Sequence, residues 1–179
     1  MIDIELRPFE REDFARLIGW VTSADLIQKW APLVFSYPLN ESQLENYIQT
    51  TEGDKPNRKI FKAVDTKNNA VVAHIELDRI DLKNRSATVA RVLVKEPALR
   101  GQGIGTEMVR KILAIGFDRL DLHRISIGVF DFKKEAIACY EKVGFVKEGY
   151  LRESWRVGDE YWSFYIMSML ESEWKALNI

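Results

Sequence analysis

Alternating apolar and polar residues predict several β-strands along the chain. Near the start, Ile2, Ile4 and Leu6 alternate with charged residues, and Pro8 limits the extension of this first strand. Three further strand-like segments occupy residues 59–64, 71–80 and 87–94. Because polar, turn-forming residues separate these three segments, we expect them to pair as an antiparallel meander. The later strands are predicted at residues 125–130, 145–157 and 161–170.

Apolar residues recur at spacings of three and four in the remaining segments, which is the pattern of amphipathic helices. These segments cover residues 14–21, 26–30, 40–53, 109–120 and 136–143. Gly144 follows the last of them and suits the left-handed position after a helix. No repeat and no linker rich in Pro, Gly or Ser divides the sequence. We therefore expect one domain, residues 1–179, with a mixed sheet flanked by helices.

Composition narrows the classes of function. The 179 residues include 26 Lys plus Arg and 27 Asp plus Glu, so the nearly neutral chain has no general attraction for nucleic acid. The single cysteine, Cys139, cannot form an internal disulfide and has no spacing typical of a zinc site, which indicates a reducing compartment and no metal. We expect no secretory signal, and no apolar run approaches the roughly 18 to 20 residues that span a bilayer. We expect a cytoplasmic protein with no membrane partner.

The segment Arg100-Gly101-Gln102-Gly103-Ile104-Gly105 lies between a predicted strand and the strongest predicted helix. The first turn of a helix has unpaired amides and the positive end of the helix dipole, and glycines leave room there for a phosphate. A Walker loop needs Gly-Lys-Ser/Thr, and a dinucleotide fingerprint needs a glycine where Thr106 stands. We therefore predict a loop that binds a pyrophosphate but belongs neither to a Walker-type NTPase nor to a dinucleotide-binding Rossmann domain. A simple tight turn into the helix is the alternative interpretation.

The same residues resemble the signature of the GNAT superfamily of N-acetyltransferases, Arg/Gln-x-x-Gly-x-Gly/Ala, which is met by Arg100, Gly103 and Gly105. The segment Ala136-x-x-x-Tyr140-Glu141-Lys142-x-Gly144-Phe145 looks like the second element of that family. The resemblance implies a GNAT-like α/β (α+β) fold. Its mixed, mostly antiparallel twisted sheet would have about seven strands, flanked by helices and splayed between strands four and five. The resemblance also implies acetyl-CoA as cosubstrate and no metal.

In the family pattern, the splay leaves a wedge for the pantetheine arm of the cosubstrate. The backbone amide of Leu93 or Val94 is then expected to donate to the thioester carbonyl and to stabilise the oxyanion. Lys133 stands where the family often has an asparagine, and it either approaches a phosphate or faces solvent. The residues expected to bind the cosubstrate are Leu93, Val94, Arg100, Gly101, Gln102, Gly103, Ile104, Gly105, Thr106 and Lys133.

Two residues are candidates for catalysis. Tyr140 stands where many family members carry the tyrosine that protonates the leaving thiolate, although its position on an apolar stripe is also typical of a core tyrosine. Glu76 is a candidate for the general base that deprotonates the amine. By simple alternation, His74, Glu76 and Asp78 point opposite to their apolar neighbours. An exposed, salt-bridged strand face explains these three residues equally well, and we expect His74 to be structural.

Residues 144–152 and the C-terminal segment Met167-Ser168-Met169-Leu170-Glu171-x-Glu173-Trp174 resemble the RimJ/RimL branch of the family. That branch includes enzymes that acetylate protein N-termini and relatives that act on small amines. We thus expect acetyl transfer to a primary amine, of a small molecule or a protein N-terminus, by direct attack. Ser163 stands where the branch often has an aspartate, and no base stands out. The alternative is therefore an acyl-CoA-binding sensor or interaction module with little catalytic activity. A homodimer is a further expected option.

Overall fold

The computed structural model describes residues 3–53, 56–95, 101 and 103–177. Within these ranges, seven strands form one sheet in the order β1-β2-β3-β4-β5-β7-β6. Neighbouring strands are antiparallel, except that β4 and β5 are parallel. This arrangement confirms the mixed, mostly antiparallel sheet and the predicted meander. The strands are β1 (Ile4–Pro8), β2 (Lys59–Asp65), β3 (Val71–Asp81), β4 (Ser86–Val94), β5 (Arg124–Phe130), β6 (Val146–Val157) and β7 (Glu160–Leu170).

The helices begin and end at residues suited to those positions. The side chain of Ser23 accepts a hydrogen bond from the Leu26 amide at 3.1 Å, and Gly144, which has φ of 116°, caps the helix that ends at Val143. None of the helices within the described ranges is long and apolar enough to cross a membrane. The helices are η1 (Arg11–Asp13), α1 (Phe14–Trp20), α2 (Ala24–Trp30), α3 (Glu41–Gln49), α4 (Ile104–Ala114), the π-helical turn η3 (Ile115–Arg119), α5 (Lys134–Val143) and α6 (Glu171–Leu177).

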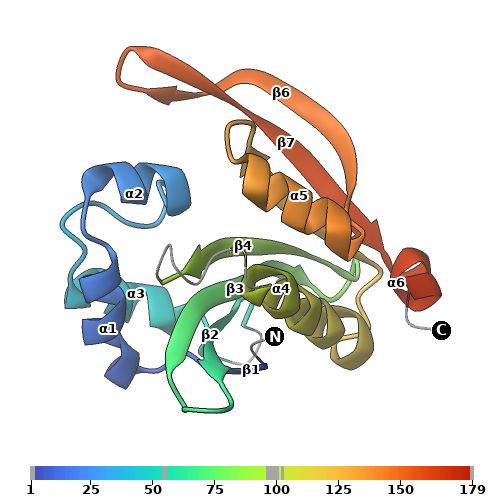
Figure 1. Cartoon of the computed structure of the whole chain (residues 1–179), viewed down its shortest axis with the longest axis horizontal. Helices are drawn as coiled ribbons and strands as arrows, with labels where there is room; N and C mark the ends of the chain where they lie inside the picture. The colour runs from blue at the N-terminus through green and yellow to red at the C-terminus, as the bar shows by residue number, and fades with distance from the viewer. Residues whose placement is uncertain (1–2, 54–55, 96–100, 102, 178–179) are drawn as a thin grey trace.

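Two hydrophobic clusters pack on opposite faces of the sheet. On one face, α4 and α5 cover Ile75 and Leu77 of β3. On the other face, α1, α2 and α3 cover Ile60 of β2 and Leu93 of β4. Figure 1 shows these three helices gathered beside the sheet, while the β6–β7 hairpin extends away from the other strands. The central strands β3 and β4 are therefore enclosed between two layers of helices.

The polar side of β3 departs from the expectation of an exposed strand face. His74, Glu76 and Asp78 do alternate with apolar neighbours, but they are only 1%, 0% and 8% exposed. The cause is tertiary, because the helices α1 to α3 cover this side of the strand. The salt-bridged part of the expectation is correct, since Glu76 and Asp78 both pair with arginines.

Candidate active site

Two glycines in the left-handed conformation shape the loop before α4. Gly101 and Gly103 have φ of 74° and 86°, where a side chain is strained. α4 begins at Ile104, and no described side chain caps that end of the helix. The amides of its first turn have no acceptors within the helix, so they face the loop together with the positive end of the dipole. Arg100 and Gln102, also expected here, lie outside the described residues.

Close packing with α5 explains the third glycine of the loop. A Cβ added at Gly105 would lie 3.7 Å from Sγ of Cys139, and the hydroxyl of Thr106 lies 3.4 Å from the same sulfur. The start of α4 is therefore fixed against the middle of α5. Cys139 belongs to this helix contact, which is consistent with a structural thiol.

The parallel strands β4 and β5 separate along their length. Their pairing runs from Ser86–Arg124 to Val89–Ile127, whereas β4 continues to Val94 and β5 to Phe130. The ladder therefore ends near the middle of each strand, and the expected splay is confirmed. The separated ends lie on the side where β4 leads into the glycine loop.

A β-bulge in β4 begins where this pairing stops. Opposite β3, the register changes from Glu76–Ala90 to His74–Leu93, so Arg91 and Val92 together face Ile75. Arg91 has φ of 49°, a left-handed conformation that costs roughly 1–2 kcal/mol for a residue with a side chain. Bulges bend a strand and increase its twist. The bulge at Arg91 is thus the local cause of the divergence from β5.

The pairing of β4 with β3 also sets the direction of the two candidate amides. The amide of Lys95 donates to the carbonyl of Val72 on β3 at 2.9 Å, and Val94 and Leu93 continue in register with Ala73 and His74. Backbone groups of successive residues point to opposite sides of a strand. The Leu93 amide therefore faces β3, whereas the Val94 amide faces the gap towards β5.

Tyr140 lies on the buried face of α5. Its side chain is 6% exposed and its ring makes an edge contact with Phe145, with centroids 6.1 Å apart. Burial, followed by the charge of Cys139, raises the pKa of Tyr140. Among the described residues, its hydroxyl makes no hydrogen bond. The residue is therefore a core tyrosine that keeps its proton and has an uncommitted donor.

Glu76 is the centre of a buried network rather than a member of an exposed face. One carboxylate oxygen accepts a hydrogen bond from the Tyr47 hydroxyl and the other pairs with Arg91. Arg58 lies 3.6 Å from the second oxygen and pairs with Asp78 at 2.9 Å. Burial outweighs these cations and raises the pKa of Glu76 to about 7. The carboxyl group is enclosed on every side and has no exposed atom for an amine to reach.

His74 belongs to the same network as a neutral ring. Burial, and then the charge of Arg91, lowers the pKa of His74 to about 3. Its Nε2 lies 3.1 Å from the Tyr47 hydroxyl. Because that hydroxyl donates its single hydrogen to Glu76, this contact requires Nε2 to carry a hydrogen. The expectation of a structural histidine agrees with this geometry.

Lys133 points towards the N-terminal helices. Its ammonium donates to the backbone carbonyl of Lys29 in α2. The contact connects the loop before α5 with the last turn of α2, where carbonyl groups have no partners within the helix. Neither of the two sequence-based interpretations, a phosphate contact or a solvent-facing side chain, anticipated this bond.

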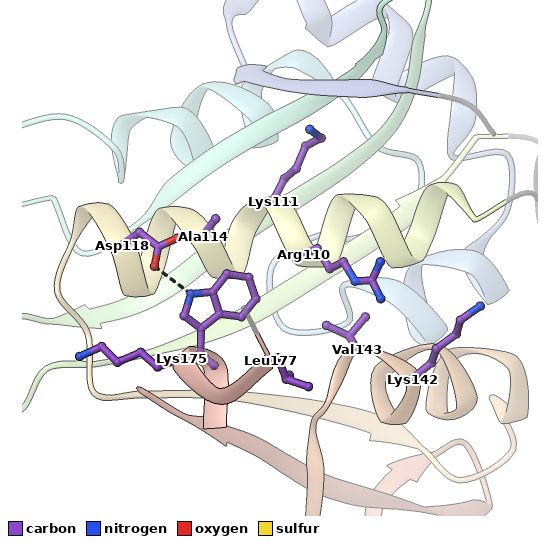
Figure 2. Close-up of a pocket in the computed structure, with 9 residues that line it drawn as sticks. Arg110, Lys111, Ala114, Asp118, Lys142, Val143, Lys175 and Leu177 are labelled. Carbon is purple, nitrogen blue, oxygen red and sulfur yellow. Dashed lines mark hydrogen bonds between the residues drawn. The ribbon is translucent and has the colours of Figure 1, made fainter. Parts of the chain in front are cut away.

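A groove lies away from the glycine loop. The groove has a volume of about 880 Å³ and is lined by the C-terminal half of α4 together with α5 and α6. The indole nitrogen of Trp174 donates to Asp118 at 2.8 Å, and Figure 2 shows the side chains of Lys111 and Lys175 projecting in different directions. Because these cations do not converge on one point, we assign no ligand to this groove.

Sequence reasoning missed three members of the Glu76 network, namely Tyr47, Arg58 and Arg91. One signal was present, since Arg91 is a single charge within the apolar run Ala90-Arg91-Val92-Leu93-Val94. A charge in a central strand needs a buried partner. The other two residues gave no signal, because Tyr47 reads as a core residue of a helix and Arg58 as part of a loop.

A glycine-shaped helix start beside a splayed pair of parallel strands defines an acyl-CoA-dependent transferase site. The family model of the acetyltransferase (GNAT) domain matches residues 3–146, and the chain belongs to this family. It is an N-acetyltransferase, and its cosubstrate is acetyl-CoA.

Two relatives and one solved structure align with nearly the whole chain at low sequence identity. The chain is 27% identical over 175 residues to the putative ribosomal N-acetyltransferase YdaF of Bacillus subtilis (strain 168), covering 96% of this chain and 91% of the relative. It is 26% identical to a spermidine N(1)-acetyltransferase of Vibrio cholerae serotype O1 (strain ATCC 39315 / El Tor Inaba N16961), covering 96% and 95%. A crystal structure of spermidine N-acetyltransferase from Vibrio cholerae in complex with CoA and spermine superposes with a TM-score of 0.82 at 25% identity, covering 96% and 98%.

Proposed function

We propose that the chain, as one domain spanning residues 1–179, transfers the acetyl group of acetyl-CoA to a primary amine by direct attack on the thioester. The observation that carries the proposal is the wedge, because β4 and β5 stop pairing after Val89 and Ile127. The opening lies at the end of β4 that leads to the glycine loop. A pantetheine arm that extends from a pyrophosphate at the start of α4 therefore has an entrance between two strands.

The loop and the wedge divide the binding of the cosubstrate between them. Gly101, Gly103, Ile104, Gly105 and Thr106 would hold the pyrophosphate through the first turn of α4, as supported by the left-handed glycines and the uncapped helix start. Arg100 and Gln102 are proposed for the same role on the sequence signature alone. Lys133 is not assigned a phosphate contact here, because its ammonium bonds the Lys29 carbonyl.

Two atoms gain negative charge in the reaction, the thioester oxygen and the thiolate sulfur, and we assign a hydrogen-bond donor to each. The Val94 amide, which faces the gap, would donate to the thioester oxygen as the amine attacks the carbonyl carbon. When the C–S bond breaks, the thiolate would take the Tyr140 proton, and the proton released by the amine would return to the tyrosine through water. The uncommitted hydroxyl of Tyr140 supports this role, whereas burial raises the pKa of Tyr140 and makes it a weaker acid than a tyrosine in water.

The role of general base, for which Glu76 is the sequence candidate, has less support than the roles proposed for the Val94 amide and for Tyr140. Its carboxylate oxygens bond Tyr47 and Arg91, and its side chain is fully enclosed. A general base must come within hydrogen-bond reach of the proton it accepts, directly or through one water. We therefore propose that water, rather than Glu76, accepts the proton of the amine.

Two classes of acceptor are proposed, a small polyamine and a protein N-terminus. The first is supported by the Vibrio cholerae relative named for spermidine. The second is supported by the putative ribosomal enzyme YdaF and by the RimJ/RimL-like residues of the sequence. The homodimer and the cytoplasmic location expected from the sequence stay predictions.

The experiment is an acceptor panel with two readouts, CoA release and the mass of the product. Acetyl-CoA would be incubated with the protein and spermidine, simple diamines or peptides with a free N-terminal amine. N-terminally blocked peptides without lysine serve as matched controls. We expect an acetylated amine with one of the two classes. A panel that gives only the hydrolysis background would contradict the proposal, and competent acetylation of Cys139 would overturn direct attack.

A further inference from the structure

The buried charges on β3 and β4 meet at the place where the sheet opens. The last β4–β5 pair is Val89–Ile127, and the bulge at Arg91 and Val92 follows after one residue. Arg91 extends from the bulge to Glu76 and Asp78 of the neighbouring strand. The ion pairs therefore connect the bulge to the most enclosed part of β3.

The conformation of Arg91 needs support from its surroundings. A left-handed backbone is unfavourable for a residue with a Cβ and persists where the surrounding structure enforces it. The side chain of Arg91 supplies that support, because one of its nitrogens pairs with Glu76 and lies 3.4 Å from Asp78. Without these pairs, a regular β4 would continue its ladder with β5 and turn the Val94 amide to a different direction.

Three other groups hold Glu76 in place. Tyr47 reaches it from α3, and Arg58 approaches from the segment before β2 while its guanidinium lies 5.4 Å from the centre of the Tyr47 ring. His74 contacts the Tyr47 hydroxyl from the other side. Tyr47 comes from α3 and Arg58 from the segment before β2. The packing of α3 on the sheet therefore fixes the position of Glu76. A carboxylate held in this way makes a rigid anchor for Arg91.

We propose that Glu76 and Arg91 are positioning residues that hold the bulge of β4 open and so direct the Val94 amide into the wedge. The inference rests on the proposed transfer reaction. It assigns Glu76 a role that requires no contact with the amine, which agrees with its complete enclosure. A small displacement of a catalytic donor can lower turnover by up to about a hundredfold, so the anchor matters although it touches no substrate.

The decisive test compares two double variants that carry the same charges. Glu76→Gln/Arg91→Gly and Glu76→Gln/Arg91→Ala both lack the ion pair, and they differ only in how well residue 91 tolerates the left-handed conformation. Glycine adopts it without strain, whereas alanine does not. We expect turnover of the glycine variant to exceed that of the alanine variant by about tenfold, with similar affinity for adenosine 3′,5′-bisphosphate. Equal turnover in the two variants would overturn the inference.

A second comparison applies even where the alanine variant fails to fold. Asp13 is another buried acid, paired with Lys62 two strands away from the wedge. We expect Glu76→Gln to lower kcat at least tenfold and Asp13→Asn to leave it within about twofold, at matched thermal stability. Wild-type kcat in Glu76→Gln would contradict the positioning role. If wild type itself acetylates none of the amines, the proposed function fails; if wild type is active but the variants do not differ, only this inference fails.

Discussion

The two faces of β3 are both buried, but different kinds of side chain fill them. Ala73, Ile75 and Leu77 pack under α4 in a purely apolar cluster, whereas His74 and Glu76 lie under α1 to α3 with arginines as partners. Burying apolar surface stabilises a fold, whereas a buried ion pair often contributes no net stability compared with apolar side chains of similar volume. The apolar face therefore explains why the sheet is stable, and the charged face needs an explanation in function.

The apolar face should give the largest effect on stability. Leu77→Ala removes a fully buried side chain and should lower the free energy of unfolding by about 2–5 kcal/mol. Turnover per folded molecule should stay near that of wild type, because Leu77 points away from the charged network. Denaturant unfolding and an assay at saturating substrate measure the two quantities. A large loss of turnover in protein that is still folded would break the contrast between the faces.

Tyr140 is buried in the apolar cluster and is nevertheless proposed to be catalytic. Tyr140→Phe keeps the ring packed against Phe145 and removes the hydroxyl, so the melting temperature should change little. The loss of a proton donor should lower kcat by about a hundredfold. Steady-state kinetics with the best amine of the panel measures this effect. Unchanged kcat would show that the residue is only structural.

A substitution in the glycine loop should lower the affinity for CoA by straining the backbone. Gly103→Val places a branched side chain at φ of 86°, and the strain of roughly 1–2 kcal/mol should lower the affinity for CoA by about tenfold. Gly19→Val is the matched control, since an added Cβ there also has open space but the backbone lies in a helix. Calorimetric titration with CoA measures both variants. Equal affinity of wild type and Gly103→Val would remove the pyrophosphate from this loop.

On the charged face, the effect of a substitution on stability should depend on pH. Burial raises the pKa of Glu76 from 4.5 to about 7, so the folded state binds a proton more tightly than the unfolded state. The stability that this proton contributes is present below pH 4.5 and is lost as the pH rises to about 7. Glu76→Gln has no such titration. The stability of this variant relative to wild type should therefore increase between pH 4.5 and 7, as measured by thermal unfolding.

The groups that face Glu76 set the size of that change. They are Tyr47 from α3, Arg58 before β2, Asp78 on β3 and Arg91 on β4. The arginines oppose the effect of burial, so the observed change should be smaller than burial alone would produce. A difference between variant and wild type that is constant across this pH range would contradict a raised pKa of Glu76.

Local sequence patterns were sufficient to predict most of the fold. Alternation located the strands, and glycines with a following apolar stripe located the start of α4. These features depend on neighbours within a few residues. The meander and the splay were also correct, the second because the family resemblance implied it.

The charged face required information that no local pattern contains. The alternation of His74, Glu76 and Asp78 is the same whether water or a layer of helices covers them. Only the packing of α3 brings Tyr47 to Glu76, across 29 positions of sequence. The direction of the Val94 amide likewise depends on the bulge at Arg91, which shifts the register by one residue. Without the position of this bulge, Leu93 and Val94 stay alternatives.

In the proposed reaction, β4 is bent so that the Val94 amide faces the thioester. The most direct measurement is a crystal structure with a nonhydrolysable acetyl-CoA analogue. We expect the carbonyl oxygen of the analogue to lie about 2.7–3.1 Å from the Val94 amide nitrogen, with the pantetheine between β4 and β5. A carbonyl oxygen bound elsewhere, with the Val94 amide paired to β5, would contradict the account.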